Sequence, residues 1–183
     1  MNKLIVAVIA VASAIAVNAA NVKWSANMGV VSPSPDGSAY AAQGWASYYT
    51  MLVFTSDQAT AVDTAIKAGN FTSLSTLAVS SNQAQVPGAF SGTVTGLTGS
   101  SVTLFGVIFD TYSATETIAD AGYYYVTGNV TQDTYDPSGN ATATTAMFTS
   151  TQMTGEWKAV PEPTSGLLLI LGMAGLALRR RRA

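Results

Sequence analysis

Uncharged apolar segments occupy both ends of this 183-residue chain and restrict the fold to what lies between them. The C-terminal segment runs from Gly166 to Leu178 and is followed by four consecutive arginines, Arg179, Arg180, Arg181 and Arg182. As a helix it would be about 20 Å long, which is less than the roughly 30 Å hydrocarbon core of a bilayer. Because arginine crosses a membrane at high cost and marks the cytoplasmic side, the four residues predict a cytoplasmic basic stop behind a short transmembrane helix.

A proline-containing motif, Val160, Pro161, Glu162 and Pro163, precedes this helix. Each proline lacks a backbone N–H and restricts the residue before it, so the helix cannot begin earlier. Motif, apolar helix and arginine cluster, in this order over residues 160–183, resemble the PEP-CTERM sorting signal, the substrate of membrane-embedded exosortases. The resemblance implies that an exosortase-type enzyme recognises and removes the signal, and that the product passes to the cell surface or to an extracellular polysaccharide matrix. On spacing and composition alone, an ordinary C-terminal membrane anchor is the alternative.

The N-terminal segment has the pattern of a signal peptide. Met1–Lys3 is a short basic region, Leu4–Val17 is apolar, and small residues follow. This pattern predicts a signal peptide over residues 1–20, cleaved after Ala19 or Ala20, with a retained N-terminal anchor as the alternative.

Residues 21–158 form the body of the protein, 138 residues that suffice for one domain with its own core. It contains three lysines and nine acidic residues, so its net charge is 3 − 9 = −6. A surface of this charge repels phosphate, so nucleic acid is excluded as a partner. Cysteine and histidine are absent, which removes disulfides, thiol chemistry and histidine-dependent catalysis or metal binding. We expect no enzymatic activity, no cofactor and no metal.

The sequence of the body predicts a mostly β fold, an antiparallel sandwich or jelly roll with one short amphipathic helix. Residues 22–30 alternate between apolar and polar side chains, which predicts a strand with one buried face. The apolar run from Tyr48 to Phe54 predicts a central strand that is covered on both faces. Further strands are predicted, with turns between them, over residues 71–79, 89–97, 101–110, 122–131 and 142–149.

The single predicted helix follows the central strand. Thr55 and Gln58 are spaced for a capping box, with Asp57 as an alternative N-cap. Beyond them Ala59, Val62 and Ile66 share one helical face before Gly69 ends the segment.

Two groups of acidic residues are candidates for chemistry. Asp133, Asp136, Ser138 and Asn140 surround Gly139, and oxygen ligands on a turn suit Ca²⁺, although acidic turns are common at strand ends. Asp110, Glu116 and Asp120 could supply a glycosidase-like carboxylate pair, for which the two groups must lie at a defined separation. We interpret these three residues as solvated surface carboxylates.

Aromatic residues are the remaining candidates. On a strand Tyr123 and Tyr125 share one face, where an exposed pair could stack on sugar rings, and Tyr124 takes the other face. Core packing is the favoured interpretation for these tyrosines, and also for Trp24, Trp45 and Trp157.

The sequence thus predicts an exported, exosortase-sorted protein that is transiently anchored in the inner membrane. We expect it to act at the cell surface or in an extracellular matrix as a structural or binding protein. Since a body of charge −6 cannot hold an acidic polymer by ion pairing, its expected glycan partner is a neutral extracellular polysaccharide, or one bridged by a divalent cation. The alternatives are a carboxylate-dependent polysaccharide-active enzyme and a simple membrane-anchored envelope protein.

Overall fold

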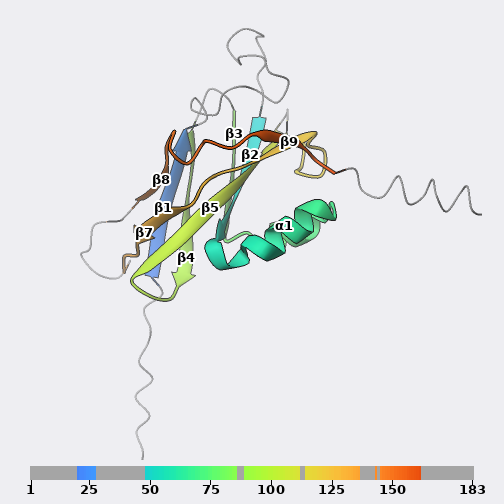
Figure 1. Cartoon of the computed structure of the whole chain (residues 1–183). Coiled ribbons are helices and arrows are strands. Elements are labelled where there is room, and N and C mark those ends of the chain that lie inside the picture. The colour runs from blue at the N-terminus through green and yellow to red at the C-terminus, as the bar shows by residue number, and fades with distance from the viewer. Residues whose placement is uncertain are drawn as a thin grey trace, which may run out of the picture.

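The computed structural model describes residues 20–27, 48–85, 89–111, 114–136, 143 and 145–161, and in this part of the chain the protein is mostly β (Figure 1). Of the predicted terminal segments, residues 1–19 and 162–183 lie outside the described residues, as do the loop over residues 28–47 and the turn over residues 86–88. Among those described, no helix is both long enough and apolar enough to cross a membrane.

The larger sheet has six strands in the order β3–β2–β5–β6–β9, with β7 also paired to β5. Every pairing in it is antiparallel. Its strands are β2 (Tyr48–Thr55), β3 (Ser80–Gln85), β5 (Ser101–Asp110), β6 (Tyr123–Val126), β7 (Val130–Asp133) and β9 (Trp157–Ala159).

Strand β2 confirms the predicted central strand. It lies between β3 and β5, and its run from Met51 to Phe54 is buried without interruption. Met51 and Val53 face one core cluster while Leu52 and Phe54 face another, so the strand is covered on both sides.

The smaller sheet has three strands in the order β4–β1–β8. In β1 (Ala20–Asn27) the predicted alternation is confirmed, because Val22, Trp24 and Ala26 are buried and Lys23 is exposed. Strand β4 (Ala89–Leu97) pairs with β1 antiparallel, whereas β8 (Thr145–Phe148) pairs with β1 in parallel. The prediction of a purely antiparallel arrangement is therefore wrong at this pair.

The predicted helix is confirmed as η3 (Ser56–Gln58) followed by α1 (Ala59–Lys67). The side-chain oxygen of Gln58 accepts a hydrogen bond of 2.9 Å from the Thr55 backbone N–H, as a capping box requires. Gly69, with a φ of 61°, follows the C-terminus of α1. This left-handed conformation favours glycine and ends the helix.

The strand predicted over residues 71–79 is wrong, because the chain forms a second helix there, α2 (Phe71–Leu77). The side-chain oxygen of Asn70 accepts from the Ser73 backbone N–H at 3.0 Å and caps the helix. Leu74 is fully buried between the half-buried Phe71 and Leu77, a spacing of three residues that suits a helix face. The fold thus has two helices where one was predicted.

The strand predicted over residues 122–131 is divided in two. Val126 of β6 lies opposite Val107, and Val130 of β7 lies opposite Leu104, so three residues on one side face two on the other. One extra residue in an antiparallel pair is a β-bulge, which interrupts the strand. The side-chain oxygen of Thr127 accepts from the Gly106 backbone N–H at 2.8 Å and fixes the bulge.

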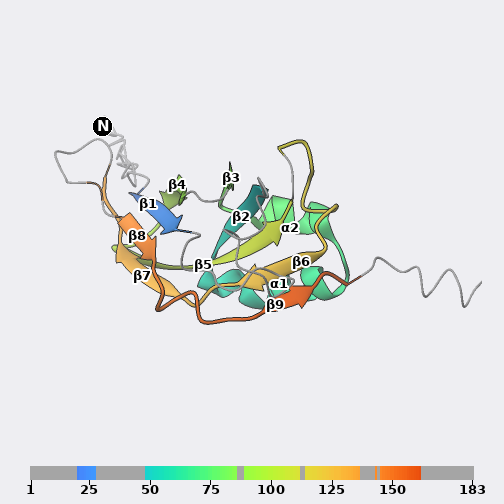
Figure 2. The same ribbon diagram turned by 90° about the horizontal axis from the view of Figure 1, so that it is seen from above.

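In the view from above, β1, β4 and β8 of the small sheet lie to one side of β2, β5 and β6 of the large sheet (Figure 2). The two sheets enclose one core cluster, to which Trp24, Phe90 and Phe148 contribute from the small sheet and Met51 and Ile108 from the large one. Helices α1 and α2 cover the opposite face of the large sheet and close the second cluster.

Candidate sorting junction and surface pockets

Strand β9 forms the last part of the described body and leads directly into the proline motif. It pairs antiparallel with β6, with Lys158 opposite Tyr124 and Trp157 opposite Tyr125. The pairing continues one residue further, because the Val160 backbone N–H donates to the Gly122 carbonyl at 2.9 Å. The first residue of the predicted sorting motif is therefore hydrogen bonded to the sheet.

Trp157 fixes β9 to the core between the two sheets. Its ring lies 5.7 Å from that of Tyr49 and 5.5 Å from that of Tyr125, distances typical of interacting aromatic pairs. The Tyr125 hydroxyl accepts from the Gly155 backbone N–H at 2.6 Å, just before the strand. Burial of Tyr125 raises the pKa of its hydroxyl.

Val160 and Pro161, the first half of the predicted motif, lie half-buried at the edge of the body. Val160 packs against the helix-side core cluster. Beside it is a pocket of about 350 Å³, lined by Phe71, Ala119, Ala121, Gly122, Tyr123, Ala159, Val160 and Pro161. Glu162, Pro163 and the arginines Arg179 to Arg182 lie outside the described residues, so their roles stay predictions.

Residues 159–182 match the family model described as the PEP-CTERM protein-sorting motif. The chain carries a PEP-CTERM sorting motif. The match covers 24 of 183 residues and confirms the resemblance seen in the sequence. It indicates an exported protein that is anchored in the membrane transiently and processed by an exosortase. No curated protein and no solved structure matches the chain.

The motif and the folded body overlap. The matched segment begins at Ala159, which is the last residue of β9 and lies opposite Tyr123. No linker of irregular chain separates the sheet from the PEP-CTERM motif.

The predicted carboxylate group is divided among different structural roles. Asp110 is 2 % exposed, so its interpretation as a surface carboxylate is wrong; its Oδ1 accepts from the Tyr123 backbone N–H at 2.7 Å and joins the ends of β5 and β6. Asp120 is exposed and accepts from the backbone N–H and the hydroxyl of Thr117, at 2.9 and 2.8 Å. These hydrogen bonds lower the pKa of Asp120. Glu116 is half-buried, and its Oε2 has no hydrogen-bond partner among the described residues.

The calcium candidate lies only partly within the described chain. Asp133 is at the end of β7, opposite Ser101, and Asp136 follows it, while Ser138, Gly139 and Asn140 lie outside the described residues. In the part that is described, no three acidic residues gather as a metal site would require.

The aromatic residues are mainly part of the core. Tyr125 is 2 % exposed and Trp24 is 1 % exposed, which confirms the core interpretation for both. The Trp24 indole N–H donates to the Ser80 hydroxyl at 2.9 Å. An exposed stacking pair of Tyr123 and Tyr125 is therefore excluded, and Trp45 lies outside the described residues.

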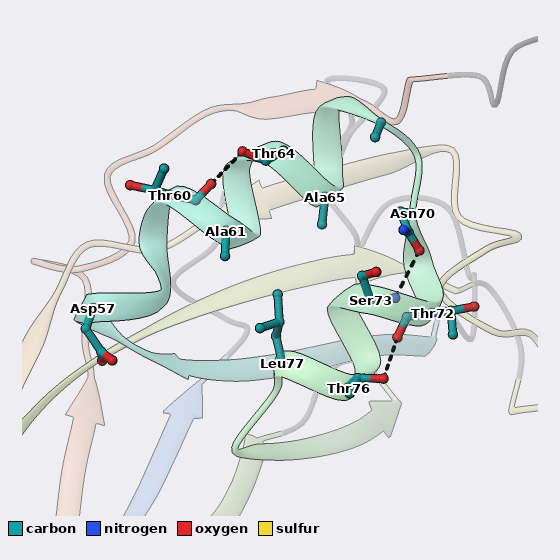
Figure 3. Close-up of a pocket in the computed structure, with 11 residues that line it drawn as sticks. Asp57, Thr60, Ala61, Thr64, Ala65, Asn70, Thr72, Ser73, Thr76 and Leu77 are labelled. Atoms are coloured by element: carbon teal, nitrogen blue, oxygen red, sulfur yellow. Dashed lines mark hydrogen bonds between the residues drawn. The ribbon is translucent and has the colours of Figure 1, made fainter.

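A groove of about 760 Å³ separates α1 from α2 (Figure 3). Ala61 and Ala65 point into it from α1 and Leu77 from α2. Two of its four threonine hydroxyls are used within the helices, since Thr64 donates to the Thr60 carbonyl at 2.8 Å and Thr76 to the Thr72 carbonyl at 2.9 Å. The groove thus offers methyl groups together with the hydroxyls of Thr60, Thr72 and Ser73.

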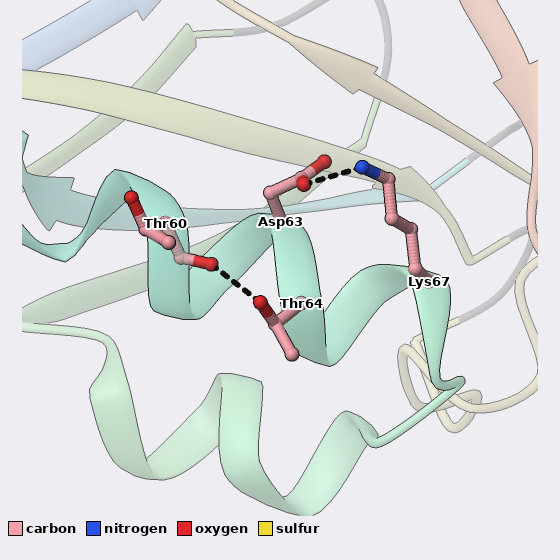
Figure 4. Close-up of polar contacts among 4 residues, drawn as sticks. All are labelled: Thr60, Asp63, Thr64 and Lys67. Carbon is pink, nitrogen blue, oxygen red and sulfur yellow. Dashed lines mark hydrogen bonds and ion pairs between the residues drawn. The ribbon is translucent and has the colours of Figure 1, made fainter.

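A second, smaller pocket of about 290 Å³ lies between α1 and the strands β5, β6 and β9. Asp63 and Lys67 of α1 lie on its side of the helix, turned away from α2, and form an ion pair of 2.6 Å (Figure 4). Sequence reasoning missed this pocket, because its residues come from four elements that only the tertiary fold brings together.

Proposed function

We propose that this protein is delivered by its PEP-CTERM motif to the outer surface or an extracellular matrix, where its β-rich body acts by binding or scaffolding, without catalysis. The observation that carries the proposal is the overlap of the motif with β9. A body fused to its sorting motif without a linker is held at the membrane surface until processing, and is then released whole.

The overlap also limits where processing can occur. Cleavage before Val160 would make β9 the C-terminal end of the mature chain. The ring contacts of Trp157 with Tyr49 and Tyr125 would then lie next to a free chain end. Val160 is held by its hydrogen bond to Gly122 and by packing, so cleavage at this residue would require the edge of the sheet to open first. We therefore place the cleavage site after Pro161.

A neutral extracellular polysaccharide is the partner that the surface supports best. The outer face of the small sheet carries hydroxyls on all three strands, since the exposed Thr93 and Thr145 lie on either side of Lys23 of β1 and the exposed Ser91 lies opposite the half-buried Ser25. Hydroxyl groups donate and accept hydrogen bonds without charge, as the hydroxyls of a neutral sugar do.

Processing is tested by mass spectrometry of the protein from its native host. We expect a mature C-terminus between Pro161 and Gly166, with residues 166–183 removed. Replacement of Glu162 by Ala should leave a membrane-retained precursor, because this carboxylate belongs to the matched motif. Glu156→Ala is the matched control, since Glu156 is exposed and precedes both β9 and the motif. Recovery of intact Arg179–Arg182 tails from native envelopes would instead support the membrane-anchored envelope protein.

Binding is tested by retention of the processed protein on its own matrix polysaccharide. We expect the double change Thr93→Val and Thr145→Val to reduce retention, while addition of salt leaves it unchanged because no ion pair is involved. Hydrolysis of the polysaccharide that is lost on substitution of Glu116 would favour the alternative, a carboxylate-dependent enzyme.

A further inference from the structure

The 290 Å³ pocket between α1 and the sheet has the construction of a small-molecule site. Its volume lies near the lower end of the range of about 300–1,000 Å³ that is usual for such sites. Apolar side chains form its floor: Val62 and Ile66 of α1, Phe105 of β5 and Val126 of β6. The first three are no more than 7 % exposed, so the floor is part of the packed core and is preformed.

Three polar side chains stand at the rim of this floor. Tyr124 and Lys158 are direct cross-strand neighbours in β6 and β9, which places their side chains on the same face of the sheet. Asn129 reaches the pocket from the bulge after β6. None of the three side chains makes a hydrogen bond or ion pair to another described residue, so their polar groups are available to a ligand.

The charge at the rim is positive, in contrast to the body as a whole. Asp63 and Lys67 neutralise each other, and their hydrogen bond raises the pKa of Lys67, which keeps the ammonium charged. Lys158 then contributes a charge that no described residue balances. The body holds only three lysines; Lys158 lines this pocket, and Lys67 pairs with Asp63 of its lining.

The available groups are mainly donors. Lysine offers three N–H donors and no acceptor, the amide of Asn129 offers two more, and the hydroxyl of Tyr124 offers one. A donor-rich rim with an unbalanced positive charge matches a ligand group that is anionic and accepts several hydrogen bonds. A carboxylate has both properties, and the apolar floor below requires a ligand with a ring or an aliphatic body.

We propose that this pocket binds a small carboxylate-bearing ligand, with the carboxylate at Lys158 and the apolar body against Val62, Ile66 and Phe105. This binding is independent of the hydroxyl face of the small sheet and of processing by the exosortase.

The test is a titration of the full chain in detergent micelles with benzoate, followed by backbone amide shifts in ¹H–¹⁵N spectra. We expect saturable shifts around α1 and β9 with about millimolar affinity. Benzyl alcohol, which has the same ring without the carboxylate, and acetate, which lacks the ring, should both bind more weakly. Addition of salt should weaken the binding of benzoate, because the charge of Lys158 at the rim is exposed and is screened by ions.

Two variants locate the site. Lys158→Met keeps the aliphatic stem and removes the charge. It should lower the affinity for benzoate about two- to fivefold, the range expected for loss of an exposed ion pair. Lys23→Met, at an exposed position on the small sheet, is the matched control and should change nothing. Ala59 is exposed and lines the pocket, so Ala59→Trp should fill it and abolish binding without removing a core side chain.

Equal affinity for benzyl alcohol and benzoate would overturn the proposal, because the pocket would then recognise the ring alone. It would also fail if folded Lys158→Met or Ala59→Trp bound benzoate like the original chain, or if benzoate produced no saturable shifts.

Discussion

The two faces of the six-stranded sheet are covered in different ways. One face packs against the small sheet, in which Trp24, Phe90 and Phe148 are no more than 2 % exposed. The other face packs against two short helices, and pockets of about 290 and 760 Å³ flank α1. Two short helices leave spaces at their sides, and both of these pockets take part of their lining from α1. We infer that the sheet-covered face mainly stabilises the body and that the helix-covered face has room for a ligand.

The largest expected effect tests whether the helix-covered face is nevertheless a true core. Phe54 is fully buried there and stacks on Phe105 at 5.4 Å. Phe54→Ala should lower the free energy of unfolding by about 3–5 kcal/mol, a large share of a typical stability of about 5–15 kcal/mol. Chemical denaturation measures it. A cost below about 2 kcal/mol would mean that the helices shift to close the cavity.

The second prediction tests how closely the two sheets are packed. Gly92 lies opposite Trp24, and a Cβ atom added there would lie 2.7 Å from the indole nitrogen and 2.9 Å from the Ser80 hydroxyl. Gly92→Ala should therefore displace a rigid ring and break its hydrogen bond, at a cost of about 1–3 kcal/mol. Gly96→Ala is an informative comparison, because no atom lies within 4 Å there and only its φ of 74° opposes alanine. If Gly92→Ala were the milder change, close packing of the sheets would be contradicted.

A smaller effect is expected where β9 joins the core. Tyr125→Phe keeps the ring contact with Trp157 and removes the hydroxyl that accepts from Gly155. We expect a loss of about 0.5–1.5 kcal/mol, the usual net contribution of one hydrogen bond. Faster amide hydrogen exchange at Gly155 and in β9 should accompany it. Unchanged exchange there would show that the hydrogen bond from Gly155 does not help to hold the strand.

The smallest effect concerns pH and the turn before β6. The hydrogen bonds from Thr117 lower the pKa of Asp120 below its ordinary value of 3.8 in the folded protein. The ionised Asp120 carboxylate therefore stabilises the folded state at pH values above 3.8. This stabilisation is lost as the pH falls through the lowered pKa, because in that range the unfolded state binds more protons than the folded state. The melting temperature of Asp120→Asn should lie slightly below that of the original chain near neutral pH, and the two should converge in acid. A difference that persists in acid would assign the effect to the side-chain shape.

Local patterns predicted much of this fold. The apolar run of β2, the alternation in β1, the capping box at Thr55 and the exact bounds of β4 and β5 follow from neighbouring residues. The mostly β class is confirmed, while the jelly-roll or sandwich class stays a prediction. Helix α2 was missed because its Ser/Thr-rich sequence resembles a strand, and the cap at Asn70 decided otherwise.

The remaining misses depend on contacts between distant residues. The bulge after Val126 is defined by the pairing of β6 and β7 with β5. The buried Asp110 accepts a hydrogen bond from the backbone N–H of Tyr123, thirteen residues later in the chain. Strand β9 has three residues and no periodic pattern, so only its pairing with β6 reveals it. The candidate pocket depends on that same strand through Lys158. Of the candidate sites, the sequence predicted the sorting motif alone.

The parallel pairing of β1 with β8 has a consequence for export. Trp24 belongs to the first described strand and its partner Ala146 to the second last, so the small sheet needs both ends of the body at once. A chain that crosses the membrane from its N-terminus presents β1 first and must wait for about 120 further residues before β8 can join it. Eight residues separate β8 from β9, which leads into the sorting motif. The strands that complete the fold and the sorting motif therefore lie close together at the end of the chain, and we expect the exosortase to meet a body that has only just become able to fold.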